Sequence, residues 1–122
     1  MRRPAIVNSD DGSVAVEFAL LLPALAMLIV GILSAGLVMY SASGLHSAVE
    51  TAARCYSVSS SQCGTASAAQ TYAQSSYYGV GSPTFTASTQ SCGHQVSATL
   101  SVVFNAAITE WTIPLSATSC FP

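Results

Sequence analysis

Residues 12–40 read GSVAVEFALLLPALAMLIVGILSAGLVMY, and the rest of the chain is arranged around this stretch. After Glu17, no acidic or basic side chain occurs until Glu50. Because a helix rises about 1.5 Å per residue, about 20 apolar residues are enough to cross the hydrocarbon core of a bilayer. Residues 18–40 meet this requirement and predict a single membrane span. A buried helix of a soluble protein is the alternative, but such a helix normally has a polar stripe.

The composition excludes whole classes of protein. With 122 residues the chain has room for one small domain, and only 7% of its residues are charged, where about a quarter is usual. The formal net charge is -2, with three basic residues in all. So few positive charges cannot neutralise a phosphate backbone, and we therefore exclude nucleic acid as a partner.

The first 12 residues, MRRPAIVNSDDG, are polar and precede the span. Arg2 and Arg3 lie before the span and only Arg54 lies after it, so the positive-inside rule places the N-terminus in the cytoplasm and the C-terminal part in the periplasm. A secretory signal peptide has a shorter apolar core that is followed by a small-residue cleavage site. No Ala-x-Ala follows this core directly, so cleavage beyond the membrane is not expected.

The junction between the leader and the span carries a recognisable pattern. Gly12 ends the leader, Glu17 lies five residues later, Phe18 follows it, and a long apolar helix begins. This resembles the processing site of type IV prepilins with short leaders, of the kind seen in tight-adherence (Flp-type, type IVb) pili. Together with the later runs GLVMY and AAR, it resembles the TadE-like minor pilins, or pseudopilins, of that system. Asp10 and Asp11 depart from the pattern, since basic residues are common there.

The resemblance implies that a prepilin peptidase cuts between Gly12 and Ser13, which leaves a new amino group on Ser13 that is positive at neutral pH. It also implies that Glu17 meets the Ser13 amino group of a neighbouring subunit, with Phe18 beside it, as the apolar helices assemble. Glu17 could instead pair within its own helix, since it lies four residues after Ser13. A solvated acid at the start of a helix, favoured by the helix dipole, is the plainest alternative.

The function that the resemblance implies is structural. The chain would be a minor pilin or pseudopilin that acts in the assembly or initiation of a tight-adherence pilus, or at its tip. Its partners would be the membrane, other pilins and pseudopilins of the same system, and the prepilin peptidase. It would reside in the bacterial inner membrane as a single-pass protein, and outside the cell once it is part of an adhesive pilus. The alternatives are a pseudopilin-like subunit of a secretion system and an uncleaved, signal-anchored periplasmic binding or sensor subunit.

Two helices are expected beyond the leader. Residues 41–56 keep helical spacing without a proline, so the membrane helix continues outward and reaches about 65 Å in length. After a break, an Ala-rich second helix is expected over residues 65–78, with Thr65 as its N-cap. The expected domains are a leader at 1–12, a long helix at 13–56 that includes the span at 18–40, and a small head at 57–122.

The tail changes from helical spacing to alternation in three segments, residues 84–88, 96–104 and 113–117. Alternation of this kind predicts half-buried strands, which we expect to pack on the helix as a three-stranded antiparallel sheet. The fold class is therefore α+β. Pro114 predicts that the last strand lies at an edge of the sheet. We expect Trp111 to cover the sheet core, with exposure at the membrane face or at a subunit contact as the alternative.

All four cysteines follow the span, at Cys55, Cys63, Cys92 and Cys120. An even number on one side of a membrane predicts two disulfides in an oxidising compartment. A zinc site is the alternative, but no CxxC pair is present and spacings of 8, 29 and 28 residues do not fit one. Of three possible pairings we prefer Cys55–Cys63, which flanks one short break, and Cys92–Cys120, which a hairpin of the last two strands would bring together.

No catalytic group of residues can be found in the sequence. Without the leader, the acids are Glu17, Glu50 and Glu110, which are too far apart along the chain for a paired-carboxylate site. His46 and His94 then have no Asp to orient them, and no phosphate-binding glycine motif is present. We therefore expect no enzymatic activity, no cofactor and no metal.

Overall fold

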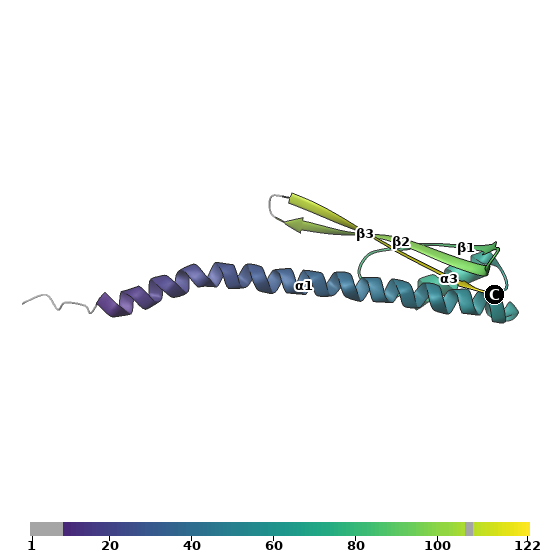
Figure 1. Ribbon diagram of the computed structural model, residues 1–122, viewed down its shortest axis with the longest axis horizontal. Coiled ribbons are helices and arrows are strands. Elements are labelled where there is room, and N and C mark those ends of the chain that lie inside the picture. The colour runs from purple at the N-terminus through teal and green to yellow at the C-terminus, as the bar shows by residue number, and fades with distance from the viewer. Residues whose placement is uncertain (1–8, 107–108) are drawn as a thin grey trace, which may run out of the picture. The chain divides into compact units, whose positions relative to one another are not determined.

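The structure, a computed structural model, describes residues 9–106 and 109–122 (Figure 1). Its elements, in chain order, are α1 (Ser9–Val58), α2 (Ser60–Cys63), α3 (Ala66–Ser76), β1 (Thr84–Gln90), β2 (Gly93–Ala106) and β3 (Thr109–Phe121). The predicted α+β class, with a long N-terminal helix, a second helix and a three-stranded antiparallel sheet, is confirmed. The chain divides into two compact units, Met1–Ala35 and Gly36–Pro122, and the boundary falls inside α1.

The helix α1 is longer at both ends than the expected residues 13–56. At its N-terminal end the described helix already includes Ser9, inside the expected leader. Pro23 lies inside α1 without ending it, as membrane helices allow. The end of the expected leader is therefore helical.

The second predicted helix is α3. Its N-cap is Thr65, whose hydroxyl oxygen accepts a hydrogen bond from the backbone N–H of Ala68 at 3.2 Å. Ala69 and Ala73, which the helical spacing places on one face, are both buried. The helix ends at Ser76, earlier than expected, because the backbone turns to an extended conformation at the next residue.

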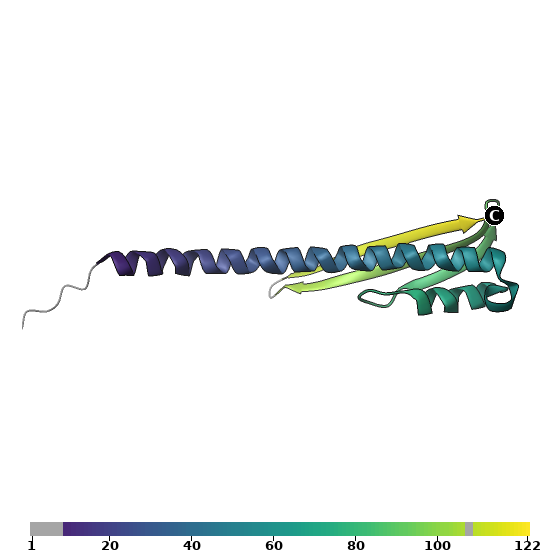
Figure 2. The same cartoon turned by 90° about the horizontal axis from the view of Figure 1, so that it is seen from below.

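The sheet has the order β1-β2-β3, with both neighbouring pairs antiparallel. β2 and β3 pair along their whole described length, whereas β1 pairs with β2 only as far as Thr99. Residues 100–106 and 109–115 therefore form a two-stranded ribbon that extends past β1, as Figures 1 and 2 both show. Pro114 lies in β3 at an edge of the sheet, as predicted.

The core of the second unit lies between the C-terminal part of α1 and one face of the sheet. Its buried members are Leu45, Ala48, Val49, Ala52 and Ala53 of α1, Ala73 of α3, and Phe85, Val96, Ala98, Leu100, Val102 and Ala117 of the sheet. The α1 members follow the spacing of one helical face, and every second residue of β2 points at them. The compact unit that carries the head therefore includes α1 from Gly36 onward.

The expectation that Trp111 covers the sheet core is wrong. Trp111 is 66% exposed and pairs with Phe104 in the two-stranded ribbon. The buried face of β2 ends at Val102, and the ribbon continues beyond it. Alternation along a strand predicts which face a side chain occupies, but not whether the core extends far enough to cover it.

Candidate assembly helix and its head

The first compact unit contains most of the apolar part of α1. Among the described residues, one helical segment, Gly12–Val58, is long and apolar enough to cross a membrane. All side chains from residue 12 to residue 33 are exposed, including those of Leu20 and Met27. Because a helix that is apolar on every side needs apolar surroundings, this segment is a single-pass membrane anchor.

The expected cleavage site, Gly12 and Ser13, lies in the first turns of α1. A Cβ atom added at Gly12 would meet nothing within 4 Å. Packing within the described chain therefore gives no reason for a glycine here, whereas a peptidase that binds an extended peptide would gain from its small size and its backbone freedom. Because Gly12 and Ser13 are helical in this structure, cleavage between them would require the start of α1 to unwind.

Glu17 and Phe18 both point outward from α1, and Phe18 is 64% exposed. Glu17 lies four residues after Ser13, so the two residues lie one turn apart on the same side of the helix. Arg54 is the one basic residue that the structure describes, and it belongs to the other compact unit. The described residues of its own unit therefore offer the Glu17 carboxylate no cationic side chain.

The loop between α3 and β1 is attached to α1 directly after the span. The backbone N–H of Val80 donates a hydrogen bond to the Ser41 hydroxyl at 3.0 Å, and Ser41 is fully buried. One turn further along α1, Gly44 faces the carbonyl oxygen of Tyr78, which a Cβ atom at Gly44 would overlap. We call these two contacts, Ser41 with Val80 and Gly44 with Tyr78, the loop clasp. The loop clasp holds the chain against α1 just before the sheet begins.

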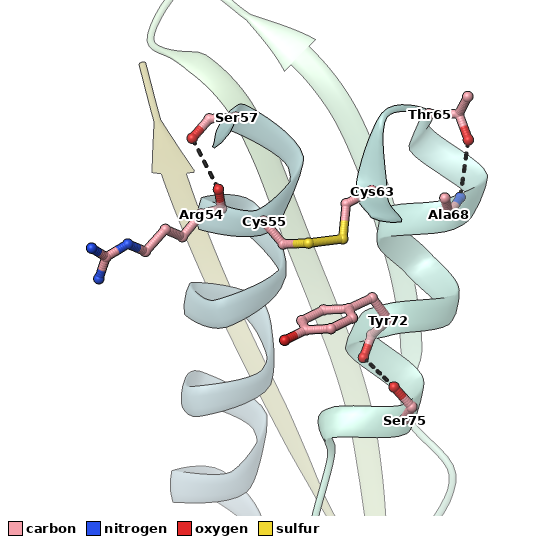
Figure 3. The surroundings of a disulfide bond; sticks show 8 residues. All are labelled: Arg54, Cys55, Ser57, Cys63, Thr65, Ala68, Tyr72 and Ser75. Atoms are coloured by element: carbon pink, nitrogen blue, oxygen red, sulfur yellow. Dashed lines mark hydrogen bonds between the residues drawn. A yellow bond between two sulfur atoms is a disulfide. The ribbon is translucent and has the colours of Figure 1, made fainter. Parts of the chain in front are cut away.

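Two disulfides are present in the described part of the chain. Cys55 pairs with Cys63 at a Cα–Cα distance of 5.7 Å, and Cys92 pairs with Cys120 at 6.3 Å. Figure 3 shows the first bridge joining the end of α1 to α2, where the sequence predicted only a break. The second joins the β1–β2 turn to the end of β3. This pairing is the one preferred from the sequence. One bridge links two helices to each other, and the other links two parts of the sheet.

The two histidines lie on different elements of the second unit, α1 and β2. His46 is exposed on α1. The ring of His94 lies against that of Tyr56, with 4.2 Å between the ring centroids. Within residues 9–106 and 109–122, no three His, Cys, Asp or Glu residues lie close enough together to hold a metal ion.

Comparison with known protein families finds a match for the N-terminal part of the chain. Residues 12–54 match the sequence model of the TadE-like protein family. The predicted resemblance to that family is confirmed over this segment. No curated protein and no solved structure matches the chain.

The TadE-like segment coincides with most of α1. It starts at Gly12, contains Glu17 and the whole apolar stretch, and ends one residue before Cys55. It also contains Ser41 and Gly44, so the α1 side of the loop clasp belongs to the segment whereas its loop side does not. The loop clasp was not predicted from the sequence. Its one signal there is the run of small residues SASG after the span, which does not indicate a contact with a distant loop.

Proposed function

We propose that the chain is a minor pilin or pseudopilin, a structural subunit in the assembly of a tight-adherence pilus. One observation carries the proposal: a fully exposed apolar helix surface begins directly after Gly12, with a single acid, Glu17, one turn beyond Ser13. The match of residues 12–54 to the TadE-like family supports the association with a pilus.

The proposed sequence of events starts with insertion into the inner membrane, with the N-terminus in the cytoplasm and the head in the periplasm. A prepilin peptidase then unwinds the start of α1 and cuts between Gly12 and Ser13. Removal of the leader creates a positive amino group close to Glu17. The mature helix can then leave the lipid and pack against the helices of other pilins.

Glu17 has a specific part in this scheme. A lone carboxylate among apolar helices costs about 2.5–3.5 kcal/mol at the centre of a span, and less near its edge. An ion pair between Glu17 and the Ser13 amino group of a neighbouring subunit would offset this cost. Because only one axial position allows the pair, it would also set the register between neighbouring helices.

The test compares Glu17→Ala and Glu17→Gln with the parent chain, and scores processing, membrane insertion and recovery with pili as separate quantities. We expect normal insertion, little loss of cleavage and strongly reduced recovery with pili. Glu50→Gln is the matched control, because Glu50 is an exposed acid on the same helix but beyond the span. Assembly of both Glu17 variants at the level of the parent would refute the role of this carboxylate.

Two other readings give different results in the same cells. A subunit of a secretion system would also be cleaved, but it would be absent from extracellular filaments. An uncleaved signal-anchored sensor would keep its leader in the presence of an active peptidase. The mass of the membrane-extracted chain and its presence in filaments therefore distinguish the three functions.

A further inference from the structure

β1 forms one edge of the sheet, so one side of its backbone has no neighbouring strand in the sheet. In an antiparallel pair, every second residue directs its N–H and C=O groups at the partner strand, and the residues between direct theirs away from it. Gln90 and Gly93 flank the two-residue turn between β1 and β2, and residues in this position bond to each other. Counting back from Gln90, the backbone groups of Phe85, Ala87 and Thr89 therefore face the open edge.

Pro114 of β3 supports the same assignment. It pairs with Ser101 of β2, and a proline, which has no N–H, fits a strand where its nitrogen faces away from the neighbouring strand. The backbone groups of Ser101 then face the β1 side of β2. Those of Thr99, two residues earlier, do the same, and Thr99 pairs with Thr84. Thr84 therefore bonds to β2, whereas Phe85, the next residue, directs its backbone groups outward.

The edge of β1 lacks the features that usually close an exposed strand. Charged side chains, prolines and bulges are the common ones. The sequence of β1, TFTASTQ, contains no charge and no proline, and each of its residues pairs with one residue of β2, without a bulge. Within the described residues, no hydrogen bond from a side chain or a loop reaches the backbone of Phe85, Ala87 or Thr89. The edge formed by β3, in contrast, contains Pro114.

A groove of about 400 Å³ lies between α3 and the start of β1. Its lining residues are Gln70, Thr71 and Gln74 of α3, together with Pro83, Thr84 and Phe85. α3 packs on the buried face of β1, where Ala73 and Phe85 share the core. Gln70 and Gln74 lie one turn apart on the same side of α3. Among the described residues, hydroxyl groups of α3 make local hydrogen bonds, whereas neither glutamine amide makes one.

We propose that this groove binds an extended, uncharged segment of another protein chain, which adds to β1 as a further strand of the sheet. The outward N–H and C=O groups of β1 bond to the backbone of the segment, as in other cases of strand addition. The amides of Gln70 and Gln74, which can each donate and accept, bond to polar groups of the segment on the side of α3. This interaction needs the head alone and does not depend on the role of the apolar helix in a pilus.

The residues around the groove set the chemistry of the segment. None of the lining side chains is charged, so a charged residue of the segment would lose water without gaining a partner. Alternate side chains of an added strand point to the α3 side and to the outer side of the sheet. On the outer side they lie beside Thr84, Thr86 and Ser88, which are exposed. Small and hydroxyl-bearing residues suit both sides, because Thr and Ser side chains bond to each other across strands.

The test measures binding of capped, dye-labelled peptides to the full chain in detergent by fluorescence anisotropy. The peptides have seven residues, as β1 has, and alternate threonine with alanine, serine, valine or glutamine. We expect saturable binding of at least one peptide. Ala87→Pro should lower its affinity at least about tenfold, because the variant loses an outward N–H and its ring obstructs the added strand. Since this N–H does not bond to β2, the sheet itself should remain folded.

The matched control is Val103→Pro. Val103 lies on β2 beyond Thr99, where β1 no longer pairs, and its backbone groups face the open side of β2 in the same way as those of Ser101. It is exposed and is not a lining residue of the groove, so the variant should bind the peptide like the parent. Thr89→Pro, at an exposed position of the β1 edge, is the second test variant if Ala87→Pro unfolds the head, which circular dichroism measures.

Several results would overturn the proposal. One is that none of the peptides binds the parent chain, and another is that a folded proline variant of the β1 edge binds as tightly as the parent. Loss of binding in Val103→Pro alone would move the site to the open edge of β2. Dimerisation of the full chain that Ala87→Pro abolishes would assign the groove to a second copy of this chain instead of a different protein.

Discussion

Replacement of Ser41 by alanine tests whether the loop clasp holds the head to the membrane helix. Ser41 is fully buried and its hydroxyl accepts the hydrogen bond of the Val80 N–H, from a residue 39 positions later in the chain. Loss of a partner that leaves a buried donor unsatisfied costs about 1–3 kcal/mol. Val80 itself is 46% exposed, so water can reach part of this loop, and we expect a loss in the lower half of that range.

The control for this variant is Ser43→Ala, since Ser43 is exposed on the same helix and undergoes the same gain in helix propensity. For a unit of this size, each kcal/mol lowers the midpoint of thermal unfolding by about 4–8 °C. Thermal unfolding of the full chain in detergent, followed by circular dichroism, measures the loss. Hydrogen exchange of the Val80 amide shows whether the lost stability arises at the loop clasp. Equal unfolding of the two variants, with unchanged protection of Val80, would refute the role of the clasp.

Three further changes have defined outcomes. Gly44→Ala should destabilise the head by about 1–3 kcal/mol in the same thermal unfolding assay, because the new Cβ atom overlaps the loop backbone. Gly36→Ala should not destabilise it, since a Cβ atom there meets nothing within 4 Å, and equal stability of the two variants would contradict the close packing at Gly44. Gly12→Leu should leave the full-length chain in the membrane, seen by intact mass, because the larger side chain has room on the helix but not in a peptidase site; normal processing would speak against cleavage here. Peptide mapping without reduction should recover Cys55 joined to Cys63 and Cys92 joined to Cys120, and a Cys55–Cys92 peptide would contradict the topology.

The order and type of the helices and strands could be predicted because they depend on local spacing. Apolar residues at helical spacing gave α1 beyond the span, and Thr65 with the alanines after it gave α3. Alternation gave three strands. The ribbon pairs residues that are close in the chain, but its length and the exposure of Trp111 depend on where β1 and the buried core end, which alternation does not show.

Some features of the candidate site could be predicted from the sequence and others could not. Gly12, Glu17 and Phe18 were visible because their spacing is short and is followed by the apolar stretch. The loop clasp was not visible, because one hydrogen bond between Ser41 and Val80 leaves no periodic pattern. A single chain shows the exposed apolar surface of α1 and not what covers it.

The central claim is that the chain is a processed pilus subunit. The most direct measurement is the intact mass of the chain recovered from sheared and purified pili, compared with cells that lack the prepilin peptidase. The account predicts that the chain is present in the pili, that it begins at Ser13, and that cells without the peptidase keep the full-length form in the membrane and have none in pili. A chain that retains Met1 in the membrane of cells with an active peptidase, and is absent from pili that otherwise form normally, would contradict it.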